Sequence, residues 1–386
     1  MTSGGVPIPG TVDSTGNVAT FTPSVPLPGA STFTARVTAG VTDNAGNPLP
    51  SEVQWSFSTP FPAFAYVANS LEGTVSIYRV DPATGQLQAL NSVAAQLAPR
   101  SIALDPAGRF LHVGNGVSNS ITGFRIGADG GLTRIEDITA GQNPSSLAVA
   151  QGRVLYAANQ GEDTVSILGI DQGSGALFTA FTPVMTGSMP SSLAIDPSIR
   201  FPYVASSGSV TPFFINQLTG GLTAAQSPVP AGTGPGFVAV EPTGRFAHVA
   251  SGGSNDVRSF EIEPDTGALE LVGAAVPAGL APGAIAADPS GRFVYVVNSG
   301  SNNVTAFRID PATGALVEIG AEVAAGSAPS SIAVDPSGRF VYVTNLASNT
   351  VTTFAIHPVT GALSAVGAAT ATGLGPGGIA ILRSLD

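Results

Sequence analysis

The residues able to carry chemistry are few in this sequence, and their types exclude several kinds of site. Cysteine and lysine are absent, while the chain has three histidines, 14 basic residues that are all arginine, and 25 carboxylates. The lack of cysteine excludes disulfides, thiolate metal sites and a cysteine nucleophile. The net charge of −11 offers no basic surface to a phosphate backbone or an anionic membrane. We therefore expect no nucleic-acid partner. No transmembrane segment is expected either, because the membrane-like stretch at residues 268–287 contains two prolines and three glycines, which make a poor spanning helix.

An internal repeat of about 46 residues decides which of these residues are scaffold, because a residue explained by its repeat position needs no functional explanation. One marker of the repeat is a proline, and the others are a Tyr/His-Val pair, as in FVYVTN (340–345), and a turn, as in DPATG (81–85 and 310–314). The repeated prolines are Pro99, Pro144, Pro190, Pro235, Pro282, Pro329 and Pro376. Asp-Pro-x-Gly segments favour tight turns, so each repeat is predicted to form four short antiparallel strands.

These features predict an all-β fold with two domains, a seven-bladed β-propeller over residues 61–386 and a smaller domain over residues 1–60. The first repeat begins at its second strand, FAYVAN (64–69), while the chain finishes on a first strand, GGIAIL (377–382). We expect the C-terminal strand to pair with the first copy and close the ring, which removes exposed sheet edges.

The histidines and most arginines occupy repeat positions. His112 and His248 stand where other copies have tyrosine, and are expected to fill half-buried strands, while His357 replaces the aspartate of a turn. Arginines follow the first turn of six copies, where they can pair with a turn aspartate: Arg109, Arg153, Arg200, Arg245, Arg292 and Arg339. The three histidines, His112, His248 and His357, lack the partners that a catalytic triad or a metal site requires.

The charged residues that remain fall on the loops of one propeller face, where the channel opens. They are Glu72, Arg100, Glu162, Asp163, Asp256 and Arg258. They are candidates for binding a polar ligand, with Arg100 as a candidate catalytic residue, and the alternative is that they are solvated loop residues. No cofactor and no metal site is predicted. Ca²⁺ binding in the loops at Asn69–Glu72 or Ser254–Asp256 is a weaker alternative, because neither has the spacing of a calcium loop.

The repeat closely resembles the YVTN-type, lactonase-like seven-bladed propellers, which include 6-phosphogluconolactonases. The resemblance rests on YVTN (342–345), DPSGR (335–339) and DPATG, and covers residues 64–386. It implies hydrolysis of a sugar lactone by His, Glu and Arg near the channel mouth. Arg100 fits that pattern, but no histidine occupies a mouth position, so the chain departs from the family where catalysis would occur.

Residues 1–60 resemble the C-terminal part of a bacterial Ig-like β-sandwich. The resemblance rests on Thr20–Pro23, Ala45–Leu49 and Trp55–Thr59, and Trp55 is expected in the core. Opening strands of such a domain have no counterpart here. We expect either that the sequence starts inside the domain, or that another chain or the propeller completes it.

Taken together, the sequence favours a non-catalytic extracellular or cell-surface platform of a bacterial protein, secreted to the surface or periplasm. Its expected partners are other protein chains or surface polymers, with self-assembly through the incomplete Ig-like domain. No signal peptide is present in the sequence as written, which begins MTSGGVPIPG. The alternative is a lactonase-type hydrolase, and hydrolysis of δ-gluconolactone distinguishes the two.

Overall fold

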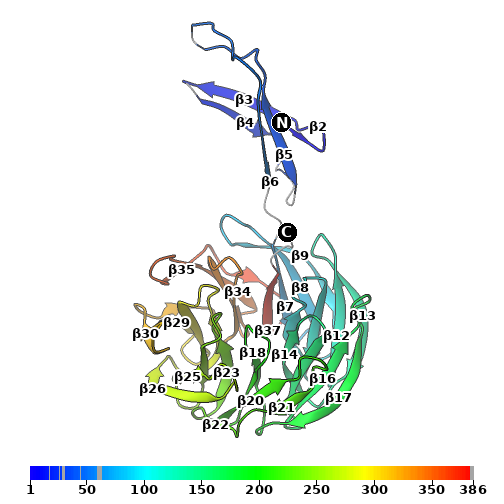
Figure 1. Cartoon of the computed structure of the whole chain (residues 1–386), viewed down its shortest axis with the longest axis vertical. Helices are drawn as coiled ribbons and strands as arrows, with labels where there is room; N and C mark the ends of the chain where they lie inside the picture. Colours follow the sequence, from blue (N-terminus) through cyan, green and yellow to red (C-terminus); the bar gives the residue numbers. More distant parts are fainter. Residues whose placement is uncertain (17, 26, 28–30, 44, 59–62, 383–386) are drawn as a thin grey trace. The chain divides into compact units, whose positions relative to one another are not determined.

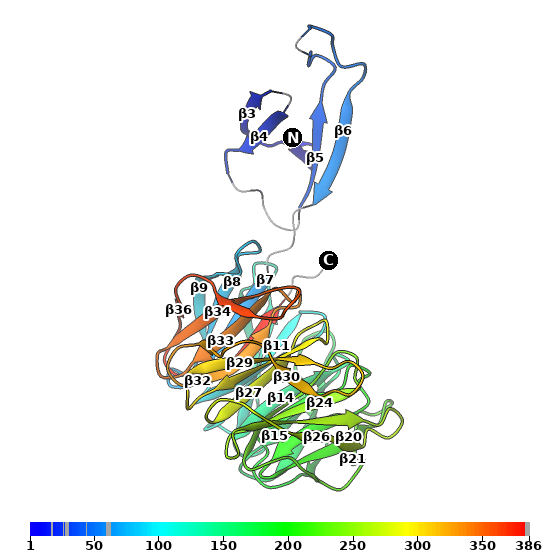
Figure 2. The same cartoon turned by 90° about the vertical axis from the view of Figure 1, so that its left-hand side faces the viewer.

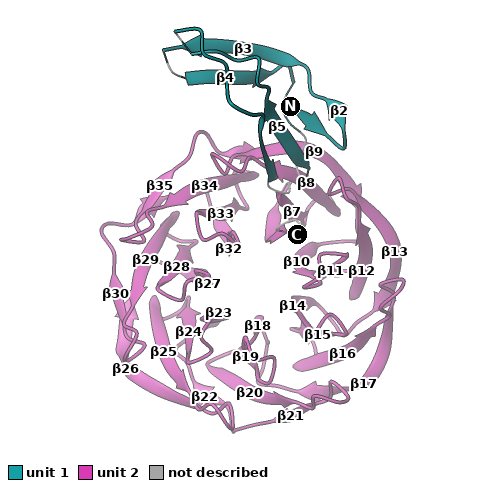
Figure 3. Cartoon of the chain, turned by 45° about the horizontal axis from the view of Figure 1, so that its top comes forward, with its two compact units in different colours: residues 1–62, 384–386 teal, residues 63–383 magenta. Residues whose placement is uncertain are grey.

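The structure, a computed structural model, describes the chain apart from residues 17, 26, 28–30, 44, 59–62 and 383–386. It divides into two compact units, one built on residues 1–62 and one on residues 63–383 (Figure 3). The predicted domain boundary between residues 60 and 61 lies outside the described residues. No described helix has the length and apolar character needed to cross a membrane.

The second unit is a ring of seven four-stranded antiparallel sheets, here called blades 1 to 7 (Figures 1 and 3). The innermost strands, in blade order, are β37 (Pro376–Leu382), β10 (Pro99–Leu104), β14 (Pro144–Ala150), β18 (Ser192–Ile195), β23 (Pro235–Val240), β27 (Pro282–Ala287) and β32 (Pro329–Val334). The second strands are β7 (Ala63–Asn69), β11 (Phe110–Asn115), β15 (Val154–Asn159), β19 (Pro202–Ser206), β24 (Phe246–Ser251), β28 (Phe293–Asn298) and β33 (Phe340–Asn345).

The outer half of each blade is more variable. The third strands are β8 (Thr74–Val80), β12 (Ser120–Ile126), β16 (Thr164–Ile170), β20 (Ser209–Ile215), β25 (Asp256–Ile262), β29 (Asn303–Ile309) and β34 (Thr350–Ile356). The fourth strands of blades 1, 2, 3 and 5 are β9 (Leu87–Ala94), β13 (Leu132–Thr139), β17 (Leu177–Met185) and β26 (Leu269–Pro277). In blades 4, 6 and 7 the fourth strand is split into β21 (Leu222–Ala224) and β22 (Val229–Pro230), β30 (Leu316–Glu318) and β31 (Val323–Ala324), and β35 (Leu363–Ala365) and β36 (Thr370–Ala371).

The predicted ring closure is confirmed. β37 pairs antiparallel with β7, with Leu382 opposite Phe64 and Ala380 opposite Tyr66. Blade 1 is therefore built from both ends of the propeller sequence, and every second strand is buried. Because the ring is closed by backbone pairing, the inner strands are held at fixed positions around the channel.

Tyrosines in the second strands join neighbouring blades. The buried hydroxyl of each donates a hydrogen bond to a turn glycine carbonyl of the next blade, at 2.8–3.1 Å, in the pairs Tyr66–Gly130, Tyr156–Gly220, Tyr203–Gly267, Tyr295–Gly361 and Tyr342–Gly85. His112 and His248 hold this position in blades 2 and 5 and are fully buried, as are their strands, so the expectation that these strands are half-buried is wrong. A second strand packed between its neighbours on both faces leaves no solvent at this position.

The arginines after the first turn join blades as well, mostly in a different way from the one predicted. Arg109 pairs with Asp105, as expected. Four other arginines instead donate hydrogen bonds from the guanidinium to turn carbonyls of the next blade, at 2.8–3.1 Å: Arg200, Arg245, Arg292 and Arg339. In these four blades the turn carboxylate already accepts the hydroxyl of a serine or threonine two residues on, as Asp196 does from Ser198. Blade 2 has Ala107 at that place, which leaves Asp105 Oδ2 to the guanidinium of Arg109.

The first unit contains a four-stranded sheet of β2 (Val6–Pro7), β1 (Thr2–Ser3), β5 (Thr32–Val37) and β6 (Val53–Ser58), and a separate hairpin of β3 (Gly10–Thr15) and β4 (Val18–Pro23) (Figure 2). Trp55 is 49% exposed, which corrects the prediction that it is a core residue. β6 is the edge strand of its sheet, and the described residues of this unit place no second layer over Trp55.

Candidate functional site at the channel mouth

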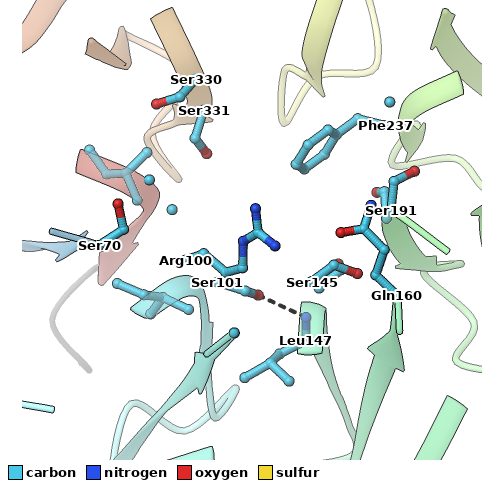
Figure 4. A pocket seen from close by; sticks show the side chains of 18 of the residues that line it. Ser70, Arg100, Ser101, Ser145, Leu147, Gln160, Ser191, Phe237, Ser330 and Ser331 are labelled. Atoms are coloured by element: carbon cyan, nitrogen blue, oxygen red, sulfur yellow. Dashed lines mark hydrogen bonds between the residues drawn. The ribbon is translucent and has the colours of Figure 1, made fainter. Parts of the chain in front are cut away.

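A pocket of about 750 Å³ opens at the mouth of the central channel (Figure 4). Its wall is made by the first residues of the inner strands and by loops between second and third strands, including Ser70 and Gln160. This is the face on which the sequence predicted a ligand site. The volume is in the range of small-molecule sites.

The backbone at the start of each inner strand shapes this wall. The residue before each repeated proline has a positive φ of 49–66°, at Ala98, Asn143, Met189, Gly234, Ala281, Ala328 and Gly375. All of these inner strands except β18 then carry a register shift at the start of their pairing. Left-handed residues and bulges redirect side chains, and they occur frequently beside functional sites.

On one side of the channel, serine hydroxyl groups accept hydrogen bonds from the neighbouring inner strand. The amide N–H of Leu147 donates to Ser101 Oγ at 2.8 Å, and the same contact joins Leu193 to Ser146 and Val238 to Ser192. The equivalent positions in blades 5, 6 and 1 hold Phe237, Ala284 and Gly378, which have no hydroxyl group, and blade 7 holds Ser331. Three of these serines thus lie on one side of the pocket and one on the other.

Arg100 lies on the side with three of the serines and points into the pocket (Figure 4). Its Nη1 donates to Asn143 Oδ1 at 2.8 Å, and Asn143 Nδ2 donates to Gln160 Oε1 at 3.0 Å. Among the described residues that line the pocket, Arg100 is the one charged side chain. The hydrogen-bonded row holds the guanidinium in place and leaves it donors for an oxygen-rich ligand.

Three predicted carboxylates of the loops do not line the pocket: Glu72, Glu162 and Asp163. Glu72 and Glu162 are exposed, and Glu72 Oε2 accepts a hydrogen bond from Thr74 Oγ1 at 3.4 Å. Asp163 has a positive φ and accepts the N–H of Met189 at 2.7 Å. Glu72 and Asp163 therefore have hydrogen-bond partners away from the pocket wall.

Asp256 and Arg258 belong to β25 of blade 5 and do not line the pocket. Asp256 accepts a hydrogen bond from Ser254 at 2.9 Å, and Arg258 Nε is buried with no partner among the described atoms. The structure thus keeps Arg100 in the candidate site and separates it from the other five predicted residues. Described His, Cys, Asp and Glu residues form no group of three that could hold a metal, and the Ca²⁺ alternative stays a prediction.

Sequence reasoning missed Phe237, Asn143 and Gln160. Phe237 enters the pocket opposite Arg100 (Figure 4). A signal was present, because Phe237 is the one aromatic residue in a slot otherwise held by Ser, Ala or Gly. Nothing in the sequence predicted the hydrogen bonds that place Asn143 and Gln160 beside Arg100.

The buried histidines cannot serve this site. Burial lowers the pKa of His112 to about 4, partly opposed by the Asp105 carboxylate, and lowers the pKa of His248 to about 3. Both rings are neutral near pH 7, and neither lines the pocket. His248 Nδ1 is bonded to Ser259 Oγ at 2.9 Å.

The fold and the pocket define a closed seven-bladed propeller with a polar channel mouth. A family model described as "Lactonase, 7-bladed beta-propeller" matches residues 32–149, 132–238 and 224–376, and one described as "Bacterial Ig-like domain" matches residues 1–59. The chain therefore belongs to the seven-bladed lactonase family, and its first residues belong to a bacterial Ig-like domain.

Individual relatives agree with this assignment. A 6-phosphogluconolactonase of Sodalis glossinidius is 32% identical over 123 residues, which cover 30% of this chain and 37% of that protein. A candidate 6-phosphogluconolactonase structure from Bacteroides uniformis has a TM-score of 0.75 at 19% identity, over 83% of this chain and 100% of the other. The periplasmic gluconolactonase PpgL of Pseudomonas aeruginosa has a TM-score of 0.73 at 23% identity, over 83% and 99%.

These comparisons correct one expectation. The sequence favoured a non-catalytic platform, but the relatives matched by sequence are 6-phosphogluconolactonases, and a structural neighbour is a gluconolactonase. That expectation gave too much weight to the missing histidine at the mouth. Small repeat residues at the rim do not exclude chemistry when Arg100, Asn143 and Gln160 converge there.

Proposed function

We propose that this chain is a lactone hydrolase that opens a sugar lactone at the channel mouth. The observation that carries the proposal is the guanidinium of Arg100, held by Asn143 at 2.8 Å in the middle of a pocket of about 750 Å³. The lactonase family and its named relatives support the choice of reaction. A pocket of this volume accommodates a single sugar ring.

The reaction adds water to the lactone carbonyl and forms a tetrahedral oxyanion. The bond from the former carbonyl carbon to the ring oxygen then breaks, the ring oxygen takes a proton, and the hydroxy acid is released with one proton to solvent at neutral pH. The step that a protein accelerates most is formation of the oxyanion, which fixed donors stabilise. Arg100 supplies a permanent positive charge and several N–H donors for it.

The remaining wall suits a sugar. Gln160 offers amide N–H groups to sugar hydroxyls, and Ser145 Oγ, which donates to the Pro190 carbonyl at 2.7 Å, can accept from one. Phe237 gives the apolar side of the ring a surface to pack against. No carboxylate or imidazole lines the described wall. The chain's own contribution is therefore binding, orientation and charge stabilisation, with water as the nucleophile.

Purified protein tests the proposal directly. We expect δ-gluconolactone or its 6-phosphate to be hydrolysed faster than in buffer, followed by the acid released in a pH-indicator assay. Arg100→Gln should lose most of the rate while keeping the thermal midpoint. No acceleration of either lactone would overturn the proposal.

A further inference from the structure

A second pocket lies where one interblade contact departs from the repeat. On the face that carries the DPATG-type turns, six of the seven blades have a phenylalanine at the start of the second strand whose ring lies against a turn glycine of the next blade. In blades 2, 4, 5, 6 and 7 the preceding arginine lies over that ring, 4.8–5.1 Å from its centroid. We call this arrangement of arginine, phenylalanine and turn the latch.

Blade 1 keeps the phenylalanine of the latch, Phe64, behind an alanine, whereas blade 3 has lost the phenylalanine itself. Val154 replaces the phenylalanine and contacts Gly220 of the next turn with its smaller side chain. The guanidinium of Arg153, unlike those of Arg200, Arg245, Arg292 and Arg339, has no hydrogen bond or ion pair to any residue that the structure describes. Arg153 is exposed. With Val154 in place of the repeated phenylalanine, Arg153 lacks the interblade contacts that the equivalent arginines make in other blades.

A cavity of about 500 Å³ occupies the position of the missing ring. Arg153 and Val154 line it together with Phe178 and Phe181 of β17 and Leu218 of the blade 4 turn. These three side chains are 54%, 37% and 96% exposed, so they form an apolar wall open to solvent. Gly169, in a slot that holds arginine in blades 1, 2 and 6, leaves room for the Phe178 ring above it.

Amide side chains hold the cavity open. Gln151 Nε2 donates to Gln217 Oε1 across the two blades at 2.8 Å, and Gln172 Nε2 donates to the Gly152 carbonyl at 2.6 Å. The first bond ties the turn of blade 4 to blade 3, and the second joins two turns of blade 3. None of these glutamine side chains is a ring that fills the place of the missing phenylalanine. The cavity thus combines a free guanidinium, fixed amides and an aromatic wall.

We propose that this cavity is a binding site for a small anion with a flat apolar body, of the aryl carboxylate class. The carboxylate pairs with the fork of N–H donors on Arg153, which matches it in geometry and charge. The ring packs against Phe178 and Phe181, where aromatic contacts favour offset or edge-to-face arrangements. The site is separate from the channel mouth and does not depend on lactone hydrolysis.

Ligand-observed NMR on the full chain tests the proposal with phenylacetate as the probe and phenylacetamide as its uncharged counterpart. Saturation transfer to the phenyl protons should be strong for phenylacetate and at least fivefold weaker for the amide. Arg153→Gln should reduce the phenylacetate signal at least fivefold. Val154→Phe should abolish it, because the new ring fills the cavity and restores the latch.

Two further variants keep the outcome decisive. Arg292→Gln removes an arginine from an intact latch and should leave phenylacetate binding unchanged. Arg100→Gln removes the arginine of the channel mouth and should also leave phenylacetate binding unchanged. A signal lost in Arg100→Gln but kept in Val154→Phe would place the anion in the channel and overturn the proposal. Equal signals from acid and amide, or no signal at millimolar probe, would overturn it too.

Discussion

The contacts between blades use the same residues in successive repeats, whereas the wall of the channel mouth uses residues that differ from blade to blade. Between blades, one set of residues recurs: a tyrosine bonded to a turn glycine, and an arginine over a phenylalanine. At the mouth, the residue after each repeated proline changes from Arg100 to serine to glycine around the ring. The difference separates repeated residues, which hold the ring together, from residues that vary at the mouth, where we propose that the substrate binds.

The largest effect should come from opening the ring. A chain ending at Gly375 lacks β37, so blade 1 loses its inner strand and β7 gains an unpaired edge. We expect a loss of about 5 kcal/mol or more, a large part of a domain's stability, together with aggregation. Denaturant unfolding measures it, with a chain lacking only residues 384–386 as the control. Equal midpoints would contradict strand-mediated closure.

Acid should weaken the two blades that have histidine in place of tyrosine. The pKa of His112 is about 4 and that of His248 about 3, each lowered from 6.5 by burial, so the unfolded chain binds more protons. Their stabilising effect is complete above pH 6.5 and is lost as the pH falls toward the folded-state values. We expect a loss of about 2–3 kcal/mol per histidine between pH 7 and pH 4.

Urea unfolding of the wild type and of His112→Tyr at both pH values measures this effect. The tyrosine variant restores the repeat residue and should lose less stability in acid than the wild type by about 2 kcal/mol. An identical pH dependence in the two proteins would show that His112 does not contribute through its protonation.

Loss of one interblade hydroxyl should have a smaller effect. In Tyr295→Phe, the carbonyl of Gly361 loses its donor at 3.0 Å while the aromatic ring remains. We expect unfolding free energy to fall by about 1 kcal/mol, the net value of a buried hydrogen bond with one partner left unpaired. Lactone hydrolysis should be unchanged. A fall in activity with unchanged stability would contradict the separation between ring contacts and channel wall.

At the mouth, Phe237→Ser should affect substrate binding more than stability. Serine matches the other blades and can accept the N–H of Ile285, as Ser192 accepts that of Val238 at 3.3 Å. Loss of the apolar wall should raise the KM for the lactone about tenfold, within the usual contribution of one apolar contact. The comparison of steady-state kinetics with denaturant unfolding tests it, and a lower melting temperature with unchanged KM would contradict it.

The propeller and its closure could be predicted because spacing, turns and the order of strands at the two ends all point to one topology. Removal of repeat positions set the histidines aside and left Arg100, which the structure places in the pocket wall. It could not predict that Asn143 and Gln160 orient Arg100, since those bonds depend on backbone bulges and positive φ values. It also could not predict the exposure of Trp55, because burial there depends on which strands cover its sheet.

The central claim is that Arg100 makes the channel mouth an active site. The most direct measurement is kcat/KM for hydrolysis of 6-phospho-δ-gluconolactone by the wild type, Arg100→Gln and the matched control Arg292→Gln. Loss of a charge-stabilising donor should lower the value about 100-fold or more in Arg100→Gln. Arg292→Gln should stay near the wild type. Equal values for wild type and Arg100→Gln, or a wild type no faster than buffer, would contradict the account.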